Sequence, residues 1–440
     1  MVHNSSWDRV LGGTLLLSLV LMPHQAQLYH WTSLEIVGKN AWLLIPTATV
    51  IATQMGLLLR ARWREHHTWF VMASFLWLAA QWAGLQWPEA HWGQVLINTR
   101  PLLMVPLALM AGLVISADWT MVRLFLVVFL VQGLLQGVIG LLHVYVFPEF
   151  VTGTFAHMRG VNYFVTEDWL RYTSRESGTL GNPSAYAEMI VLGAFAGCRL
   201  LAIDGMVRSS RGFWVVSLGL CLLMTLAILP SLSRASTVFV LVPFMMILMG
   251  KLSCDVKGRY SAVLLGALIV LIVLFVLTSY PQLFQRFTIE GMYGRTQKNT
   301  MLFDALTEDS RVFFFGLPVF QVLTLRTPEG MGFGDNSYLR LAAACGWPLF
   351  LAWILLLAQI WHSAPRNVGE SLTASGLRVT FFIYLLAQLY LGDVLFNDGW
   401  MLMAVMLLGV YLQPSASSPP GNPQKNLNAL PASFNSKESL

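Results

Sequence analysis

The residues of this chain that are best suited to chemistry lie in a polar stretch, residues 280–340, between two strongly apolar segments. It contains Arg286, Arg295 and Asp335. A guanidinium group binds phosphate oxygens through paired hydrogen bonds, and a carboxylate accepts a proton from a nearby hydroxyl group. This combination predicts a site that binds a phosphate-bearing substrate and activates a hydroxyl group.

The two arginines also have a simpler structural interpretation. Arg286 and Arg295 would both suit contacts with solvent or with lipid headgroups. We expect Arg295 to start an amphipathic helix, Thr296–Leu306, whose apolar stripe is typical of packing or of a membrane interface. The sequence therefore leaves two interpretations of each arginine open.

Asp335 is the candidate catalytic base, but its surroundings also suit a helix start. Asp335, Asn336 and Ser337 are all residue types favoured at a helix N-cap. Whether Asp335 is a base or a helix cap stays open from the sequence. Asn336 and Tyr338 are added as candidate substrate-binding residues.

A second polar stretch ends at Asn182-Pro183, where an apolar segment begins. Asparagine is favoured at the N-cap and proline in the first turn, so capping explains this pair. Glu188 is less easily explained, because an acidic group inside a membrane is costly. The candidate substrate-binding residues of this region are Arg171, Arg175, Asn182 and Glu188.

The composition excludes an ordinary soluble protein. Hydrophobic residues make up 56% of the chain, charged residues only 11%, and the mean hydropathy is +0.62, whereas soluble domains are about one quarter charged. Much of the basic excess behind the net charge of +5 lies in short loops on one side, where it indicates membrane topology. Nucleic-acid binding is therefore not expected.

Neither a disulfide framework nor a cofactor site is predicted. No two of the four cysteines have C-x-x-C spacing, and the sequence has no convincing carboxylate cluster for a metal. The phosphate-loop, nucleophile-elbow and zinc-protease motifs are also missing. Chemistry at the arginines would need a substrate that carries its own leaving group.

Apolar windows predict an all-α fold, a bundle of about twelve membrane-spanning helices. We expect residues 1–412 to form this membrane domain, and residues 413–440, rich in Pro, Ser and Asn, to be a disordered cytoplasmic tail. The windows are residues 10–22, 41–59, 68–87, 94–116, 120–147, 184–202, 213–229, 235–249, 260–279, 338–361, 377–395 and 400–412.

The distribution of Lys and Arg predicts the orientation of these helices. One set of loops carries the basic residues of the short loops, and the alternate short loops carry none, so the first set is expected to be cytoplasmic. Both termini are then cytoplasmic, and two long loops, residues 148–183 and 281–336, lie outside. The basic residues are Arg60, Arg62, Arg64, Arg123, Arg208, Arg211, Lys251, Lys257, Arg259, Arg366 and Arg378.

Arg234 is an exception to this pattern. It follows Ser233 after a short outer loop and begins an apolar window. An arginine at a helix end often extends to the membrane surface, but its presence on the side that otherwise lacks basic short loops favours anion binding. We add Arg234 as a catalytic candidate and Ser233 as a substrate-binding candidate.

Three motifs follow one another along the chain. The first is Gly-Thr-Leu-Gly-Asn-Pro at residues 178–183, and the second is the pair Ser233-Arg234. The third is the outer region with Arg286-Phe287, Arg295, Phe-Gly-Leu-Pro at residues 315–318 and Asp-Asn-Ser-Tyr-Leu at residues 335–339. In order and spacing they resemble the bacterial O-antigen ligase and polymerase superfamily of integral membrane glycosyltransferases. The resemblance covers roughly residues 171–355 and the overall topology.

The resemblance implies a glycan donor joined to undecaprenyl pyrophosphate, at the periplasmic face of the bacterial inner membrane. An acceptor hydroxyl would attack the anomeric carbon and the lipid pyrophosphate would leave, without a metal or a cofactor. Arg234 and Arg286 would contact the pyrophosphate, with Arg295 next, and Asp335 stands at the family's base position. The lipid bilayer, and chain-length regulators or export proteins, are further partners to expect.

One departure from the family pattern bears on the acceptor. Ligases that attach O-antigen to lipid A-core typically have histidine where this chain has Asp335, which favours a polymerase that extends a glycan acceptor. Ligation to lipid A-core or to a protein is the alternative. A lipid-glycan flippase or transporter is the second alternative, and it would need charged residues along a central path.

Overall fold

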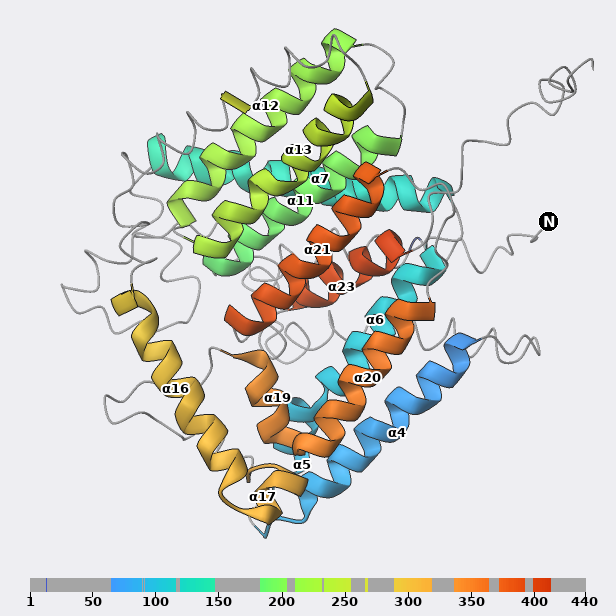
Figure 1. Ribbon diagram of the computed structural model, residues 1–440, viewed down its shortest axis with the longest axis vertical. Coiled ribbons are helices and arrows are strands. Elements are labelled where there is room, and N and C mark those ends of the chain that lie inside the picture. Colours follow the sequence, from blue (N-terminus) through green and yellow to red (C-terminus); the bar gives the residue numbers. More distant parts are fainter. Residues whose placement is uncertain are drawn as a thin grey trace, which may run out of the picture.

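The computed structural model describes twelve stretches of the chain and the single residue 13. Every regular element within these stretches is a helix, and no strand occurs in them (Figure 1). The described stretches are residues 65–88, 90, 92–115, 119–146, 183–203, 210–231, 233–254, 266–267, 289–318, 336–363, 372–391 and 399–412.

Four helical segments of the described chain are long and apolar enough to cross a membrane. They are Thr68–Leu85, Trp92–Leu113, Thr120–Leu142 and Ala185–Ala202. Shorter apolar helices cover Val215–Ser231, Ala235–Ile247 and Trp347–His362. The prediction of an all-helical, membrane-compatible chain is confirmed in this part of the molecule. The windows 10–22, 41–59 and 260–279 lie outside it, apart from residues 13, 266 and 267.

The helices follow most of the predicted windows closely. Those that agree within a few residues are α4 (Glu65–Leu85), α7 (Trp119–Tyr145), α11 (Pro183–Ile203), α12 (Ser210–Ile228), α13 (Arg234–Cys254), α21 (Leu372–Leu391) and α23 (Gly399–Leu412). Long apolar runs fix these boundaries because the backbone must satisfy its own hydrogen bonds wherever water is absent.

Two predicted windows are each divided into two helices. The window 94–116 forms α5 (Trp92–Thr99) and α6 (Pro101–Ile115), with the break at Arg100, because a proline has no N–H to continue the helical ladder. The window 338–361 forms α19 (Ser337–Cys345) and α20 (Trp347–Ser363). The break there is Gly346, whose φ of 79° suits glycine.

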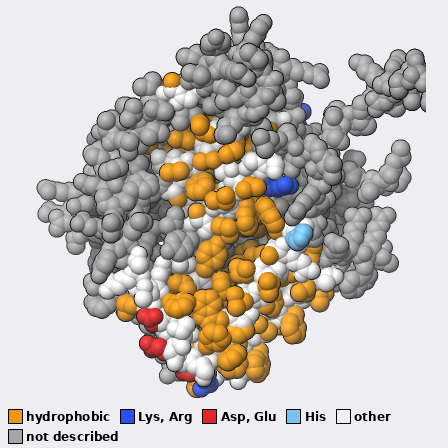
Figure 2. All heavy atoms as spheres, in the orientation of Figure 1, with side chains coloured by type: hydrophobic (Ala, Val, Ile, Leu, Met, Phe, Trp, Pro, Cys, Tyr) orange, Lys and Arg blue, Asp and Glu red, His pale blue; other side chains and the backbone are white. Residues whose placement is uncertain are grey.

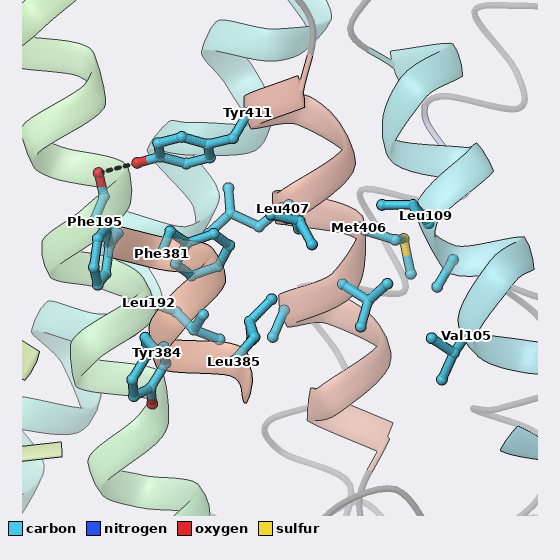
Figure 3. Close-up of a cluster of buried hydrophobic side chains, with 14 of the residues drawn as sticks. Val105, Leu109, Leu192, Phe195, Phe381, Tyr384, Leu385, Met406, Leu407 and Tyr411 are labelled. Carbon is cyan, nitrogen blue, oxygen red and sulfur yellow. Dashed lines mark hydrogen bonds between the residues drawn. The ribbon is translucent and has the colours of Figure 1, made fainter. Parts of the chain in front are cut away.

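Close helix packing forms the centre of the bundle. A Cβ built on Gly133 of α7 would lie only 2.8 Å from the Cα of Gly193 in α11, so these two helices approach along glycine. Figure 3 shows α11, α21, α23 and α6 sharing an apolar cluster, in which the Tyr411 hydroxyl donates a 2.6 Å hydrogen bond to the Phe195 carbonyl. This packing fixes the positions of the helix ends that carry the candidate residues.

The polar stretch forms two helices that the sequence predicted only in part. Helix α16 (Ile289–Thr307) begins before Arg295, so the prediction that Arg295 starts the helix is wrong. Gly291 and Gly294 lower the helix propensity of this first part, yet the helix includes them. The predicted packing stripe is confirmed, because Leu302 and Leu306 are 1% and 0% exposed.

Helix α17 (Ser310–Phe315) was not predicted, and contacts at and after this helix join the polar stretch to the bundle. The Arg311 guanidinium lies 4.5 Å from the centre of the Trp87 ring and donates a 3.1 Å hydrogen bond to the Gln86 carbonyl. After α17, the Leu317 N–H donates a 2.7 Å hydrogen bond to the Ala343 carbonyl at the end of α19. Both contacts join residues far apart in the sequence.

One face of the described chain is covered by hydrophobic side chains over α4, α20 and α21, while acidic side chains gather at its edge beside α16 and α17 (Figure 2). Phe75, Leu355 and Ile383 are 69%, 69% and 50% exposed on these three helices. A contiguous apolar face of this kind suits contact with lipid.

Candidate functional site

The candidate site lies where four helix ends meet. Helix α21 contacts α11, α13 and α19, and α11 also contacts α13. Hydrogen bonds described below join the starts of α13 and α19 to the last two turns of α21. Helix α11 packs against α21 through the rings of Phe195 and Tyr384. In Figure 1 the lower ends of α11, α13 and α21 lie together, above the start of α19. The predicted topology required these four ends to share one side.

A tight turn positions the start of α13. The 3-10 turn Leu229–Ser231 follows α12 directly, and the Ser231 hydroxyl donates to the Ile228 carbonyl and accepts from the Ser233 N–H. The Ser233 carbonyl in turn accepts from the N–H and the hydroxyl of Thr237, at 3.0 and 2.7 Å. Ser233 is thereby fixed immediately before Arg234, which begins the helix as predicted.

The Ser233 side chain starts a row of polar groups that crosses to α21. Its hydroxyl donates a 3.0 Å hydrogen bond to the hydroxyl of Ser236, and the Gln388 amide nitrogen donates a 3.3 Å hydrogen bond to the same Ser236 oxygen. Ser236 is 0% and Gln388 5% exposed. Polar groups buried this deeply are costly unless they pair with one another, which makes this row a specific feature of the helix junction.

Tyr384 and Glu188 are two further buried polar residues of these helices. Tyr384 is fully buried, its ring packs against Phe195 of α11 and Phe239 of α13, and its hydroxyl has no hydrogen-bond partner among the described residues. Figure 3 shows this hydroxyl pointing away from the apolar cluster that surrounds the Tyr384 ring. Glu188 is 1% exposed. The two predicted residues Ser233 and Glu188 therefore lie near the starts of two helices, α13 and α11, that pack against each other.

The start of α19 supplies two more of the predicted residues. Asn336 is 3% exposed, and its side-chain oxygen accepts from the backbone N–H groups of Tyr338 and Leu339, at 3.0 and 3.2 Å. Asn336 is therefore the N-cap, so the cap that the sequence could not assign among three residues belongs to it. The Tyr338 hydroxyl donates a 3.2 Å hydrogen bond to the Leu386 carbonyl of α21. Leu386 lies between Tyr384 and Gln388 in the sequence.

The remaining predicted residues are covered by the structure only in part. For Arg234 and Arg295 the description extends to the backbone, which is helical at both positions. The others lie outside the described residues: Arg171, Arg175, Asn182, Arg286 and Asp335.

Three buried polar residues at the helix junction were missed by sequence reasoning. Ser236, Tyr384 and Gln388 lie inside apolar windows, where averaged hydropathy hides single polar residues. A signal was available, because Tyr384 and Gln388 are four residues apart and so share one helix face. Polar groups at that spacing in an apolar helix point to a polar partner on a neighbouring helix.

The comparisons with known proteins add no family to this description. No protein-family model, no curated protein and no solved structure matches the chain.

Proposed function

We propose that this chain is a membrane glycosyltransferase that acts as a glycan polymerase. It transfers oligosaccharide repeat units from a polyprenyl-pyrophosphate carrier to an acceptor sugar at the outer face of the bacterial inner membrane. One observation carries the proposal: helices that begin at the resembling motifs, α11 at Pro183, α13 at Arg234 and α19 at Ser337, start around the same junction with α21.

The chemistry of the residues at this junction fits that reaction. Helix N-termini carry partial positive charge, which favours anions, and Arg234 begins one of them. Arg234 and Arg286, with Arg295 next, would stabilise the charge that grows on the leaving pyrophosphate. Asp335 or another carboxylate would take the proton of the acceptor hydroxyl. The reaction requires no metal ion and no cofactor.

The proposed topology has about twelve spans, both termini in the cytoplasm and residues 148–183 and 281–336 in the periplasm. It is supported by the junction itself. The proposed chain path puts the starts of α11, α13 and α19 and the end of α21 on one side of the membrane. Hydrogen bonds join the starts of α13 and α19 to the end of α21, and α11 packs against α13 and α21.

The proposal is tested with purified protein in detergent, where transport across a membrane cannot occur. Undecaprenyl-pyrophosphate-linked repeat units serve as donor, and product length is measured by mass spectrometry. We expect the wild type to form longer glycans and Arg234→Ala and Arg286→Ala to lower turnover by about 100-fold, the usual effect of removing a group that stabilises transition-state charge.

Arg123→Ala is the matched control, because Arg123 is exposed in the first turns of α7, on the side expected to be cytoplasmic. Its activity should equal that of the wild type. Full activity of both Arg234→Ala and Arg286→Ala would remove the site assignment. A wild type that forms no glycosidic bond would reject the enzyme and favour the flippase.

Polymerase and ligase are separated in cells. Deleting the gene of a polymerase leaves single repeat units on the surface acceptor, whereas deleting a ligase gene removes all of them. Loss of every repeat unit would show that ligation, to lipid A-core or to protein, is the reaction.

A further inference from the structure

Exposed apolar side chains of α4 form a stripe that reaches the end of the helix which the predicted topology puts outside. Phe75, Leu78, Trp82 and Leu85 are 69%, 58%, 60% and 44% exposed, and they follow one another at helical spacing. The stripe belongs to a segment that is long and apolar enough to cross a membrane. Because tryptophan is enriched where hydrocarbon gives way to lipid headgroups, Trp82 marks the expected outer boundary of this surface.

Helix α17 lies beside this boundary. The rings of Trp82 and Phe315 contact each other edge to face, with their centroids 5.9 Å apart. The Phe314 carbonyl lies against Gly346, immediately before α20 begins. These contacts place α17 at the level of the last turn of α4 and against both α4 and α20, the helices that carry much of the apolar face in Figure 2.

Two phenylalanines of α17 continue that apolar face. Phe313 and Phe314 are 37% and 55% exposed, and their ring centroids lie 5.3 Å apart. Val312 is buried in the same turn, so the two phenylalanine rings are not the side chains that pack α17 into the bundle. Exposed rings forfeit the burial of apolar area in water, whereas the boundary between headgroups and acyl chains accepts them.

Charged residues precede these two phenylalanines in the chain. Asp304, Glu308 and Asp309 are exposed, and acidic side chains lie at the edge of the apolar face (Figure 2). The exposed Arg311 guanidinium donates to the Gln86 carbonyl and has further N–H donors for water or headgroup phosphates. A helix at a membrane interface has this division, with aromatic side chains toward the acyl chains and charges toward water.

We propose that α17 is a membrane-interface anchor whose partner is the outer leaflet of the phospholipid bilayer. Phe313 and Phe314 insert at the headgroup boundary beside Trp82, and Arg311 lies at the level of the headgroup phosphates. Continuity with the apolar face of α4 and α20 favours lipid over a protein partner. The anchor holds residues 289–318 at the membrane surface. It requires insertion of the protein in a membrane but not the proposed glycosyl transfer.

Depth-dependent fluorescence quenching tests the anchor. Phe314→Cys is labelled with bimane and reconstituted, at a low ratio of protein to lipid, into phosphatidylcholine vesicles that carry bromine at different depths of the acyl chains. The wild type, whose described cysteines are buried, is labelled in parallel as background. Phe314→Cys should lose most fluorescence with bromine near the headgroups. Leu355→Cys, midway along the exposed face of α20, should lose most with bromine near the chain ends.

Glu308→Cys is the matched control, because Glu308 is exposed between α16 and α17. Its label should keep its fluorescence in brominated vesicles and lose it when iodide is present in the water on both sides. A label at residue 314 that iodide quenches and brominated lipid does not would overturn the anchor and put α17 in water.

The same labels separate lipid from other occupants. A label at residue 314 that neither quencher reaches would overturn the anchor in favour of a protein partner, and cross-linking of two Phe314→Cys copies would identify that partner as a second copy. Loss of lipid quenching at Leu355→Cys as well would overturn the lipid contact of the whole face. Should Phe314→Cys fail to fold, as thermal unfolding would reveal, Phe313→Cys decides the question by the same outcomes.

Discussion

The cap of α19 gives the sharpest prediction about local stability. In Asn336→Ala, the backbone N–H groups of Tyr338 and Leu339 lose the acceptor that they share at 3.0 and 3.2 Å. Loss of an Asn cap costs about 0.5–2 kcal/mol. Because Asn336 is only 3% exposed, water replaces the lost acceptor poorly, so we expect the upper end, about 2 kcal/mol.

Amide hydrogen exchange in detergent measures this cost directly. A loss of about 2 kcal/mol corresponds to roughly 30-fold faster exchange at Tyr338 and Leu339 when exchange follows local opening. Asn336→Asp keeps an oxygen acceptor at the helix N-terminus and should keep slow exchange. Asp309→Ala is a comparison variant. It removes a cap that is exposed and accepts only from Arg311 N–H, at 2.8 Å, so its effect on α17 should be smaller.

The same variants separate capping from substrate binding. If Asn336 serves only as the cap, glycosyl transfer by Asn336→Asp should match that of the wild type. Slow exchange combined with lost activity in Asn336→Asp would show that the carboxamide contacts substrate. Unchanged exchange at both amides in Asn336→Ala would refute the capping argument.

Two further predictions concern α17 and Gly346, the residue that ends α19 and packs against α17. In Gly346→Ala, the new Cβ would clash with the Phe314 carbonyl, and alanine would have to adopt the φ of 79° that Gly346 has. We therefore expect a clear fall in the unfolding temperature. Gly219→Ala is the comparison variant: a Cβ at Gly219 would meet nothing within 4 Å, so this variant should gain about 0.5–1 kcal/mol of helix stability. Arg311→Ala should lose about 0.5–1 kcal/mol of local stability with its contact to the Trp87 ring, read as faster amide exchange in α17, and equal exchange in the variant would contradict it.

The sequence predicted where the helices lie better than where they break. Windows of apolar residues locate a buried helix because burial is summed over about 20 residues. They do not detect a local break, which depends on one or two residues. Pro101 could have been recognised, since proline commonly opens a helix. The division at Gly346 could also have been recognised, since glycine followed two residues later by Pro348 is a typical helix end. The tertiary contact with the Phe314 carbonyl, which leaves no room for a Cβ, could not be predicted from the local pattern.

Sequence reasoning identified the charged residues of the candidate site and the neutral residues at helix starts, but it missed the neutral residues inside the apolar windows. Glu188 was visible because a carboxylate is costly within an apolar helix. Ser236, Tyr384 and Gln388 at the same helix junction carry no charge, and two of them come from a helix almost 200 residues further along the chain than Glu188. Which neutral side chains gather at this junction depends on the packing of α11 against α13 and α21, so only the three-dimensional arrangement could identify them.

The hydrogen bond from Leu317 to Ala343 has a consequence for how this protein could diversify. The chain leaves α17 bonded to the end of α19 and returns to the start of α19 at Asn336. Residues 319–335 therefore connect two points of the chain that are both bonded to α19, one near its end and one at its start. Since closing a loop depends only weakly on its length, insertions and deletions there should leave the helix junction intact. Related chains could vary the length of this segment to suit different acceptors while keeping the same helix junction.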